Sequence, residues 1–483
     1  MTLSNANATS NGTWWSRPSG GREVLRVAAP LVVSSLSWTI MTFFDRLFLN
    51  RGVSGEAMDA SFTSSVVWFA FLALPLGICA YANTFVAQYD GANRHDRIGL
   101  VFWQAIWLSC GLGLLTLVLI PLAPALFELA RYTAEESADD ILYFQIICLC
   151  GPGLLVSEAS KTFYSGRGQT WVVMIVDAAT AAIELVLNYA WIFGYLGFPA
   201  MGLEGAAWST VVGMWLKAVV YVGLPLQRKY HQEFGTIAGI RWDNELLRRI
   251  LYFGWPSGLQ ILLDVTGFTV FIFVLNALGD VAKQATSLAF SISSLAFMPI
   301  YGLHIAASVL VGERLGEDRD DLAARATFTT MQVSWAYMIV ISLLYAVTPQ
   351  LFLFGFFPNG AATTAEHMAV RDMAATLLLF VAAYNLLDAT QMIFVGALKG
   401  AGDTQFLLRV SLVLAALLAT FSYLSVEVWM LNIFGAWTLV VFWCLIAAAA
   451  YGVRFWQGKW RRMRVIEPSV RDSREFLPAA AIE

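Results

Sequence analysis

The sequence predicts an all-α integral membrane protein with twelve transmembrane helices, arranged as two six-helix lobes related by an internal repeat. Three observations lead to this fold class. The chain of 483 residues is 58% hydrophobic and only 13% charged, and its mean hydropathy is +0.65. Apolar runs of about 20 residues recur along the chain, and its second half repeats features of the first.

The composition excludes a soluble globular chain of this length, because such a chain carries charge on roughly one-quarter of its residues. In lipid, only helices and closed barrels satisfy the backbone polar groups. Barrel strands would give short alternating segments, whereas the apolar runs here are long and do not alternate. The net charge of −4 and the isoelectric point near 5.7 give no indication of nucleic-acid binding.

Twelve apolar segments predict the membrane-spanning helices in order along the chain. These segments cover residues 27–50, 60–88, 98–121, 140–165, 171–194, 203–226, 250–277, 284–312, 325–348, 370–397, 404–427 and 431–455. The resulting domains are a cytoplasmic tail 1–24, an N-lobe 25–226, a cytoplasmic linker 227–249, a C-lobe 250–457 and a cytoplasmic tail 458–483. The polar tail from Arg461 onward is expected to be disordered or to lie on the surface.

The distribution of Lys and Arg predicts the orientation in the membrane. Of the 30 such residues, 24 lie at the termini or after even-numbered helices, five lie on the opposite side, and Lys217 lies inside the sixth predicted helix. Positively charged loops are typical of the cytoplasmic side. We therefore expect both termini in the cytoplasm, and the bacterial cytoplasmic (inner) membrane as the location.

The two halves resemble one another in sequence. The segment TFVAQYDGANRHD in the first half is similar to SVLVGERLGEDRDD about 225 residues later. A second pair, SGRGQT (165–170) and KGAGDT (399–404), follows the fourth and the tenth predicted helix. Two copies of six helices share one topology and are related by an axis along the membrane normal, an arrangement that suits alternating access.

Carboxylates interrupt four of the apolar segments. Asp264 and Asp388 lie in the seventh and tenth predicted helices, and Asp45 and Glu184 in the first and fifth. A charged carboxylate at bilayer depth is costly unless it is paired, neutralised or hydrated, so it usually marks an ion or substrate path. The alternative for any one of them is a protonated acid that only bonds a neighbouring helix. Four together favour the functional interpretation.

The segments around these residues resemble the multidrug and toxic compound extrusion (MATE) antiporters, and the NorM-type branch most. The segments that carry the resemblance are MTFFDRLFLNRGVSGEAMDA, VAQYDGA, PSGLQILLDVTGF, LAFMPIYGLHIAASVLVGERLG and, above all, YNLLDATQMIFVGALKGAGDT. The resemblance covers roughly residues 25–455. It implies a two-lobed transporter that exports small organic cations in exchange for Na⁺ or H⁺.

The resemblance also implies the residues of an ion site in the C-lobe. They are Asp264 on the seventh helix and Tyr384 and Asp388 on the tenth. Tyr384 and Asp388 are four residues apart and share a helix face, so their oxygens are able to point at one ion. Oxygen ligands suit Na⁺ and a carboxylate alone suits H⁺, so the same residues are the candidate Na⁺ ligands.

In the N-lobe, the resemblance implies a site formed by Asp45 with Glu184 and Asn188 on the fifth helix. The first position of that fifth-helix pair is commonly Asn in the family, so Glu184 is a departure that adds a titratable group. It favours a proton site and leaves the coupling ion open. Ser209 or Thr210 matches a hydroxyl that some members carry on the sixth helix.

Three further polar residues have competing interpretations. Lys217 is expected to form an ion pair with Glu184 or Glu204, which would neutralise Glu184, or else to contact substrate. Asp177 has two interpretations, a solvated residue at the cytoplasmic mouth and a coupling site, and the first is favoured. His304 is expected to make a hydrogen-bonded contact between helices. The alternative is a proton relay, which its intrinsic pKa would suit.

Two other classes of protein compete with the antiporter. A membrane-embedded protease would use the GAGD sequence at 400–403, but a basic turn explains that sequence better, and no nucleotide or metalloprotease motif is present. A polyprenyl-lipid or oligosaccharide flippase of the same broader superfamily would need a basic cavity, whereas acids prevail here. We therefore expect no enzyme, no cofactor beyond the coupling ion, and no nucleic-acid partner. The expected partners are organic cations and membrane lipids, and the expected state is a monomer.

Overall fold

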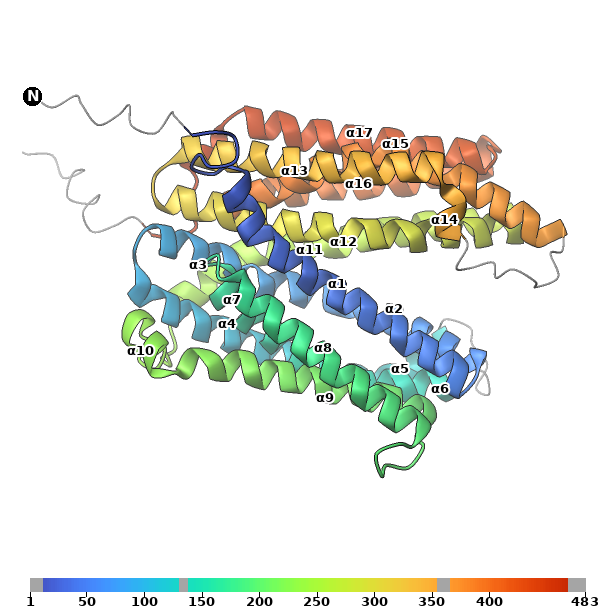
Figure 1. Ribbon diagram of the computed structural model, residues 1–483, viewed down its shortest axis with the longest axis horizontal. Coiled ribbons are helices and arrows are strands. Elements are labelled where there is room, and N and C mark those ends of the chain that lie inside the picture. The colour runs from blue at the N-terminus through green and yellow to red at the C-terminus, as the bar shows by residue number, and fades with distance from the viewer. Residues whose placement is uncertain (1–11, 130–137, 354–364, 468–483) are drawn as a thin grey trace, which may run out of the picture.

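The computed structural model describes residues 12–129, 138–353 and 365–467 (Figure 1). Within these ranges, twelve helical segments are long and apolar enough to cross a membrane. The predicted all-α class and the twelve predicted spans are thereby confirmed. The predicted tails 1–24 and 458–483 lie partly outside the described residues.

The spans fall into two halves of the chain. Those of the first half are α1 (Gly21–Gly52), α2 and α3 (Gly55–Ala80, Ala82–Gly91), α4 (His95–Thr116), α6 and α7 (Ala138–Cys148, Cys150–Ser165), α8 (Thr170–Phe193), and α9 with η1 (Gly202–Gly223, Leu224–Leu226). Those of the second half are α11 (Asn244–Leu275), α12 (Asp280–Gly316), α13 (Asp320–Val347), α15 (Ala365–Ala401), α16 with η3 (Thr404–Tyr423, Leu424–Val428), and α17 (Ile433–Trp456). The shorter elements are α5 (Leu119–Leu129), α10 (Arg228–Phe234), η2 (Asn276–Leu278), α14 (Pro349–Leu353) and η4 (Lys459–Arg462).

The segment predicted as a linker contains helical structure. It holds the short helix α10, which ends at Gly235 in the left-handed conformation (φ +61°) that favours glycine. The seventh span begins at Asn244 and not at the predicted residue 250. Asp243 accepts a hydrogen bond from the backbone N–H of Leu246 (3.0 Å) and so caps the first turn. Hydropathy missed this turn because its residues are polar.

The helices of each half pack mainly against one another, and α1, α2 and α3 also contact α11 and α12 of the other half. Figure 1 shows α1 close to α12 near the N-terminus and beside α8 toward its other end. Gly77 lies against the backbone of Gly258, and Gly302 lies against Val32. A Cβ at either glycine would collide with these neighbours, so glycine permits the close approach of the two halves.

The segment that follows α17 packs between the two halves, which corrects the prediction of a disordered or surface-lying tail from Arg461 on. Val465 is fully buried, and its N–H donates to the side-chain oxygen of Gln88 on α3 (2.8 Å). Its carbonyl accepts a hydrogen bond from Arg249 on α11 (2.5 Å). Arg461 and Arg462 are exposed, as predicted, but the prediction failed for residues 465–467 because their partners are distant in sequence.

Glu467 completes this connection with charged partners from both halves. It accepts a hydrogen bond from the Tyr89 hydroxyl (2.6 Å) and pairs with Arg94 and Arg97 (3.1 Å for Arg97) at the start of α4. Arg249 of the second half lies 3.2 Å from the same carboxylate. Burial alone would raise the pKa of Glu467, but Tyr89, a backbone N–H, Arg97 and Arg94 together hold that pKa below its ordinary value.

This lowered pKa predicts a pH-dependent contribution to stability. A carboxylate with a depressed pKa stabilises the folded state above its unfolded pKa of about 4.3, and the contribution is lost as the pH falls through the folded value. We expect Glu467→Gln to lower the thermal unfolding midpoint at pH 7 and the difference from wild type to shrink toward zero at the lowest pH. Thermal unfolding in detergent between about pH 3 and pH 7 tests this.

The matched control is Asp318→Asn, because Asp318 pairs with Arg464 of the same segment (2.9 Å) but has an 83% exposed side chain. An exposed pair contributes little, so this variant should unfold like wild type at every pH. A constant difference between Glu467→Gln and wild type across the pH range would contradict the assignment.

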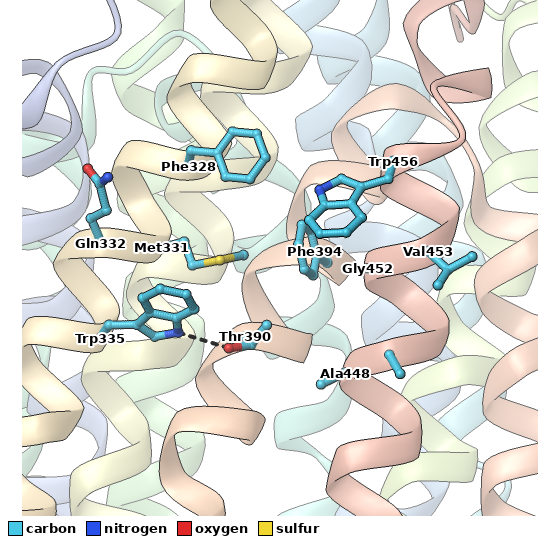
Figure 2. Close-up of a pocket in the computed structure, with 11 residues that line it drawn as sticks. Phe328, Met331, Gln332, Trp335, Thr390, Phe394, Ala448, Gly452, Val453 and Trp456 are labelled. Carbon is cyan, nitrogen blue, oxygen red and sulfur yellow. Dashed lines mark hydrogen bonds between the residues drawn. The ribbon is translucent and has the colours of Figure 1, made fainter.

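A groove of about 460 Å³ opens at the surface of the second half among α13, α15 and α17 (Figure 2). Its walls are apolar and include Phe328, Phe394 and Trp456. Away from Phe328 and Trp456, the indole N–H of Trp335 donates a hydrogen bond to the hydroxyl of Thr390 (2.8 Å).

Candidate functional site

The second half places Asp388 and Tyr384 on successive turns of α15. Asp388 accepts a hydrogen bond from the side-chain amide of Gln391 (2.7 Å). The Tyr384 hydroxyl is buried and lies 3.2 Å from the hydroxyl of Ser293 on α12. Tyr384 is thus held by α12 and is not bonded to Asp388, although the two residues share a helix face as the sequence predicts.

Asp264 on α11 belongs to the same half. Its side chain is exposed to solvent, and it has Gln260 and Ser411 as hydrogen-bonding neighbours. Lys399 and Asp388, both on α15, are close enough to interact with it electrostatically. The two carboxylates and the neutral oxygens around them form a solvent-accessible, oxygen-rich site that suits a hard cation or a proton.

Among the described residues, no group of three or more His, Cys, Asp and Glu side chains could hold a metal ion. The predicted Na⁺ ligands Asp264, Tyr384 and Asp388 contain only two carboxylates, so any cation there would need neutral oxygens as well. Ser411 and Ser293 were missed by the sequence because their position depends on helix packing. Gln391 could have been found from the sequence, because it lies three residues after Asp388 and therefore on the same face of the helix.

In the first half, the structure brings the predicted residues together between α1 and α8. The side-chain amide of Asn188 donates a hydrogen bond to Asp45. Glu184, one turn earlier on α8, is 2% exposed, and Thr210 on α9 is a hydrogen-bonding neighbour of it. The sixth-helix hydroxyl at this site is therefore that of Thr210.

Two atoms of this first-half cluster are buried without a hydrogen-bond partner: Oε1 of Glu184 and Oδ1 of Asn188. Buried polar oxygens are normally hydrogen-bonded, and each exception requires an explanation. The carboxylate also lies against Gly213 of α9, where a Cβ would collide with it. The cluster therefore has the ligand capacity for one proton or one small cation.

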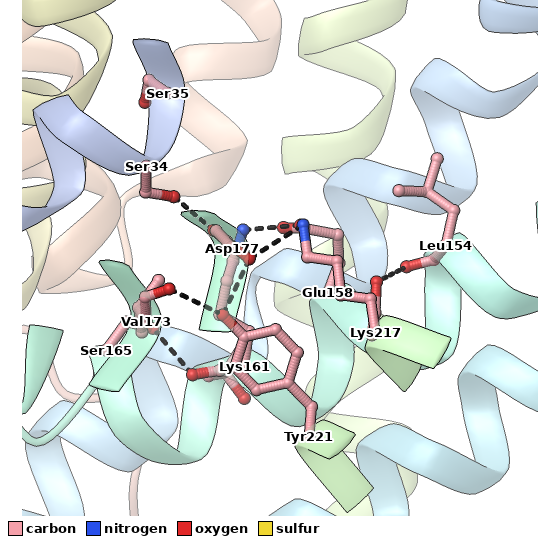
Figure 3. Close-up of polar contacts among 12 residues, drawn as sticks. Ser34, Ser35, Leu154, Glu158, Lys161, Ser165, Val173, Asp177, Lys217 and Tyr221 are labelled. Atoms are coloured by element: carbon pink, nitrogen blue, oxygen red, sulfur yellow. Dashed lines mark hydrogen bonds and ion pairs between the residues drawn. The ribbon is translucent and has the colours of Figure 1, made fainter. Parts of the chain in front are cut away.

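Lys217 pairs with Asp177 and not with Glu184 or Glu204, which corrects the sequence prediction (Figure 3). Its ammonium nitrogen lies 2.9 Å from Oδ1 of Asp177, and the Tyr221 hydroxyl donates to the same oxygen (2.8 Å). Lys217 therefore forms no ion pair with Glu184 and acts on it only as a more distant positive charge.

Asp177 was predicted as a solvated mouth residue, and this prediction is wrong. The residue is 5% exposed, and Ser34 of α1 bonds its second oxygen. A further ion pair, Glu158 with Lys161 (2.5 Å), lies beside it in Figure 3. The sequence missed this network because α1, α7, α8 and α9 come together only in the folded chain.

Two remaining polar residues have structural partners. His304 on α12 makes a 2.7 Å hydrogen bond through Nδ1 to the carbonyl of Met392 on α15, which is the helix contact that the sequence favoured. Asp403 of the GAGD sequence binds Arg454 through both carboxylate oxygens (2.6 and 3.1 Å). Gly402 before it has φ +100°, so the segment is a turn closed by an ion pair.

Comparison with known proteins gives one family. The chain matches the family model described as MatE over residues 30–190 and 256–424. It is 27% identical to the multidrug resistance protein PmpM of Pseudomonas aeruginosa, over 80% of this chain and 79% of that protein. It is 26% identical to the probable multidrug resistance protein NorM of Xanthomonas axonopodis pv. citri, over 92% of this chain and 95% of that protein.

Solved structures agree on the fold. One described as the outward-facing conformation of a multidrug resistance MATE family transporter of the MOP superfamily has a TM-score of 0.80 at 18% identity. The match covers 92% of the present chain and 96% of the chain in that structure. Another, a MATE in complex with MaD3S, has a TM-score of 0.81 at 19% identity, with the same coverage.

Proposed function

Because this chain belongs to the MATE family of transporters, we propose that it is a secondary active antiporter that exports organic cations in exchange for Na⁺ or H⁺. The family is one of transporters and not of enzymes. Curated relatives are named as multidrug resistance proteins, which supports cationic drugs as the cargo.

The observation that carries the proposal is a contrast between acids that have a cationic partner and acids that have none. Asp177 and Asp403 have cationic partners within 4 Å and are structural. In the part of the chain that the structure describes, Asp45, Glu184 and Asp388 have no such partner. Unpaired carboxylates inside membrane spans are typical of ion or substrate paths.

Asp264 also lacks an ion pair among the described residues, so unpaired acids occur in both halves. A cationic drug and the coupling ion would compete for this negative charge, or favour opposite conformations. Binding of one then weakens binding of the other by the same factor, which is the thermodynamic requirement for exchange.

We further propose that the two halves act as lobes and that the end where Glu467 joins them faces the cytoplasm. The basic residues Arg94, Arg97 and Arg249 gather at that end, and positive charge is typical of the cytoplasmic side. Contacts between the halves there support a conformation closed toward the cytoplasm.

Efflux from liposomes tests the function. Purified protein is reconstituted, ethidium is loaded, and Na⁺ and H⁺ gradients are imposed separately. Ethidium movement that requires one of the gradients supports the antiporter and identifies the ion. No gradient-dependent movement by a folded protein would reject it and favour the lipid or oligosaccharide flippase.

Asp45→Asn should lower gradient-driven efflux by roughly tenfold, within the range typical of coupling between sites. The asparagine keeps the size of the side chain but neither carries charge nor releases a proton. The measurement is the initial efflux rate in the same liposomes, with the exposed Asp59→Asn on α2 as the control. Unchanged efflux in Asp45→Asn would remove the first-half cluster from the mechanism.

A further inference from the structure

The groove among α13, α15 and α17 faces outward from spans that are long and apolar enough to cross a membrane. Trp456 and Val453 on its wall are 76% and 55% exposed. The indole N–H of Trp335 and the hydroxyl of Thr390 bond each other, so these two polar groups present no free donor to an occupant. Gln332 is a further polar residue of the wall, and its side-chain oxygen accepts a hydrogen bond from the indole N–H of Trp14. The other lining residues are apolar or glycine and suit a hydrocarbon chain.

Figure 2 shows Phe328 and Trp456 at one end of this groove, and basic residues lie close to both of them in the sequence. Arg325 lies one turn before Phe328 on α13, and residues 325, 328, 332 and 335 share one helix face. Lys459 and Arg462 are exposed residues of η4, which begins three residues after Trp456 in the chain.

Contacts between aromatic rings hold η4 at this end of the groove. Phe455 packs edge-on against Phe328 of α13 (5.7 Å between ring centroids) and stacks on Trp460 of η4 (4.7 Å). Arg461 reaches across to Asp320 at the start of α13 (2.8 Å). These contacts bring η4 to the end of α13 that carries Arg325.

The charges at this end are not balanced. Asp320 is paired with Arg461 and Asp318 with Arg464. By contrast, Arg325, Lys459 and Arg462 have no ion-pair partner within 4 Å among the described residues. Asp321, the remaining acid at the start of α13, is exposed and also unpaired. Three free cations against one free acid attract an anion.

We propose that this groove is a binding site for an anionic phospholipid, with one acyl chain along α13, α15 and α17 and the headgroup phosphate at Arg325, Lys459 and Arg462. Basic and aromatic residues together are typical of the membrane interface, where lipid headgroups lie. The site does not depend on the proposed transport function. An occupied groove would fix α13 and α17 against α15, the helix that carries Asp388.

Native mass spectrometry of the protein in neutral detergent tests the proposal. The probes are phosphatidylglycerol and phosphatidylcholine with identical acyl chains. Wild type should retain phosphatidylglycerol with at least about fivefold preference, since each basic residue near the headgroup favours an anionic lipid. Glycerol phosphate without acyl chains should not displace it. Equal retention of the two lipids would overturn the proposal, and so would displacement by glycerol phosphate.

Two variants separate the headgroup from the groove. Arg325→Gln with Arg462→Gln should reduce phosphatidylglycerol retention to the phosphatidylcholine level. Ala449→Phe fills the groove from its exposed wall and should reduce retention of both lipids. The matched control is Arg409→Gln, an exposed residue of α16 that does not line the groove.

Each variant must unfold in lipid-free detergent at the wild-type temperature, which confirms that it is folded. Under that condition, undiminished phosphatidylglycerol retention by either variant contradicts the site. If Ala449→Phe instead abolished binding of an apolar fluorescent drug while lipid retention stayed intact, the groove would be a drug site and the lipid proposal would be wrong.

Discussion

Asp388→Asn is expected to reduce gradient-driven efflux to the level of protein-free liposomes while the protein folds normally. Within residues 12–129, 138–353 and 365–467, the carboxylate has no ion-pair partner, and Gln391 donates a hydrogen bond to it. Asparagine keeps the shape and the carbonyl acceptor but removes the charge that a cation or a proton would occupy. The expected result is therefore a loss of transport without a loss of stability.

The measurement is the initial efflux rate of ethidium under the gradient that drives wild type. Asp372→Asn serves as the control, because Asp372 lies on the same helix α15 but has a 73% exposed side chain paired with Arg371. This variant should transport normally. Wild-type efflux by a folded Asp388→Asn protein would exclude the second-half site from coupling.

Lys217→Met should destabilise the protein by about 3 to 5 kcal/mol, the loss typical when one partner of a buried ion pair is removed. Methionine retains the length of the side chain but removes the ammonium paired with Asp177, which is 5% exposed, and leaves the more distant Lys161 as a nearby cation. Among the described residues, Tyr221 and Ser34 would remain as hydrogen-bond donors to that carboxylate. The thermal unfolding midpoint in detergent measures the effect.

The double variant Asp177→Asn, Lys217→Met removes both charges and should recover most of the loss, because no uncompensated buried charge remains. Lys229→Met, an exposed residue of α10, is the matched control and should leave the midpoint unchanged. If the single and double variants were equally unstable, packing of the Lys217 side chain would explain the effect and the ion pair would not.

Sequence alone was sufficient for the spans, since each needs only a run of apolar residues long enough to cross a bilayer. All twelve predicted spans are helices in the structure. The predicted start of a span was wrong where polar residues begin the helix, as at Asn244, because a hydropathy pattern does not detect a capped polar turn. The domain boundaries, the orientation and the roles of the site residues stay predictions.

Within the candidate site, sequence and family resemblance placed Asp45, Glu184 and Asn188 in one cluster, and the structure brings them together. A carboxylate in an apolar run is visible from the sequence itself. Its neighbours on other helices are not. Ser293 beside Tyr384 and Thr210 beside Glu184 depend on how the helices rotate and pack.

The sequence by itself determined that this chain spans a membrane twelve times and carries acids inside its spans, because both properties depend on residues close together in the chain. Only the tertiary structure decided which acids are paired. Lys217 was expected to pair with Glu184 or Glu204, whereas helix packing places it beside Asp177. Packing likewise brought Glu467 to Arg94, a contact across 373 residues. An ion pair acts over a few ångströms between atoms, so it depends on the separation in space and not on the separation along the sequence.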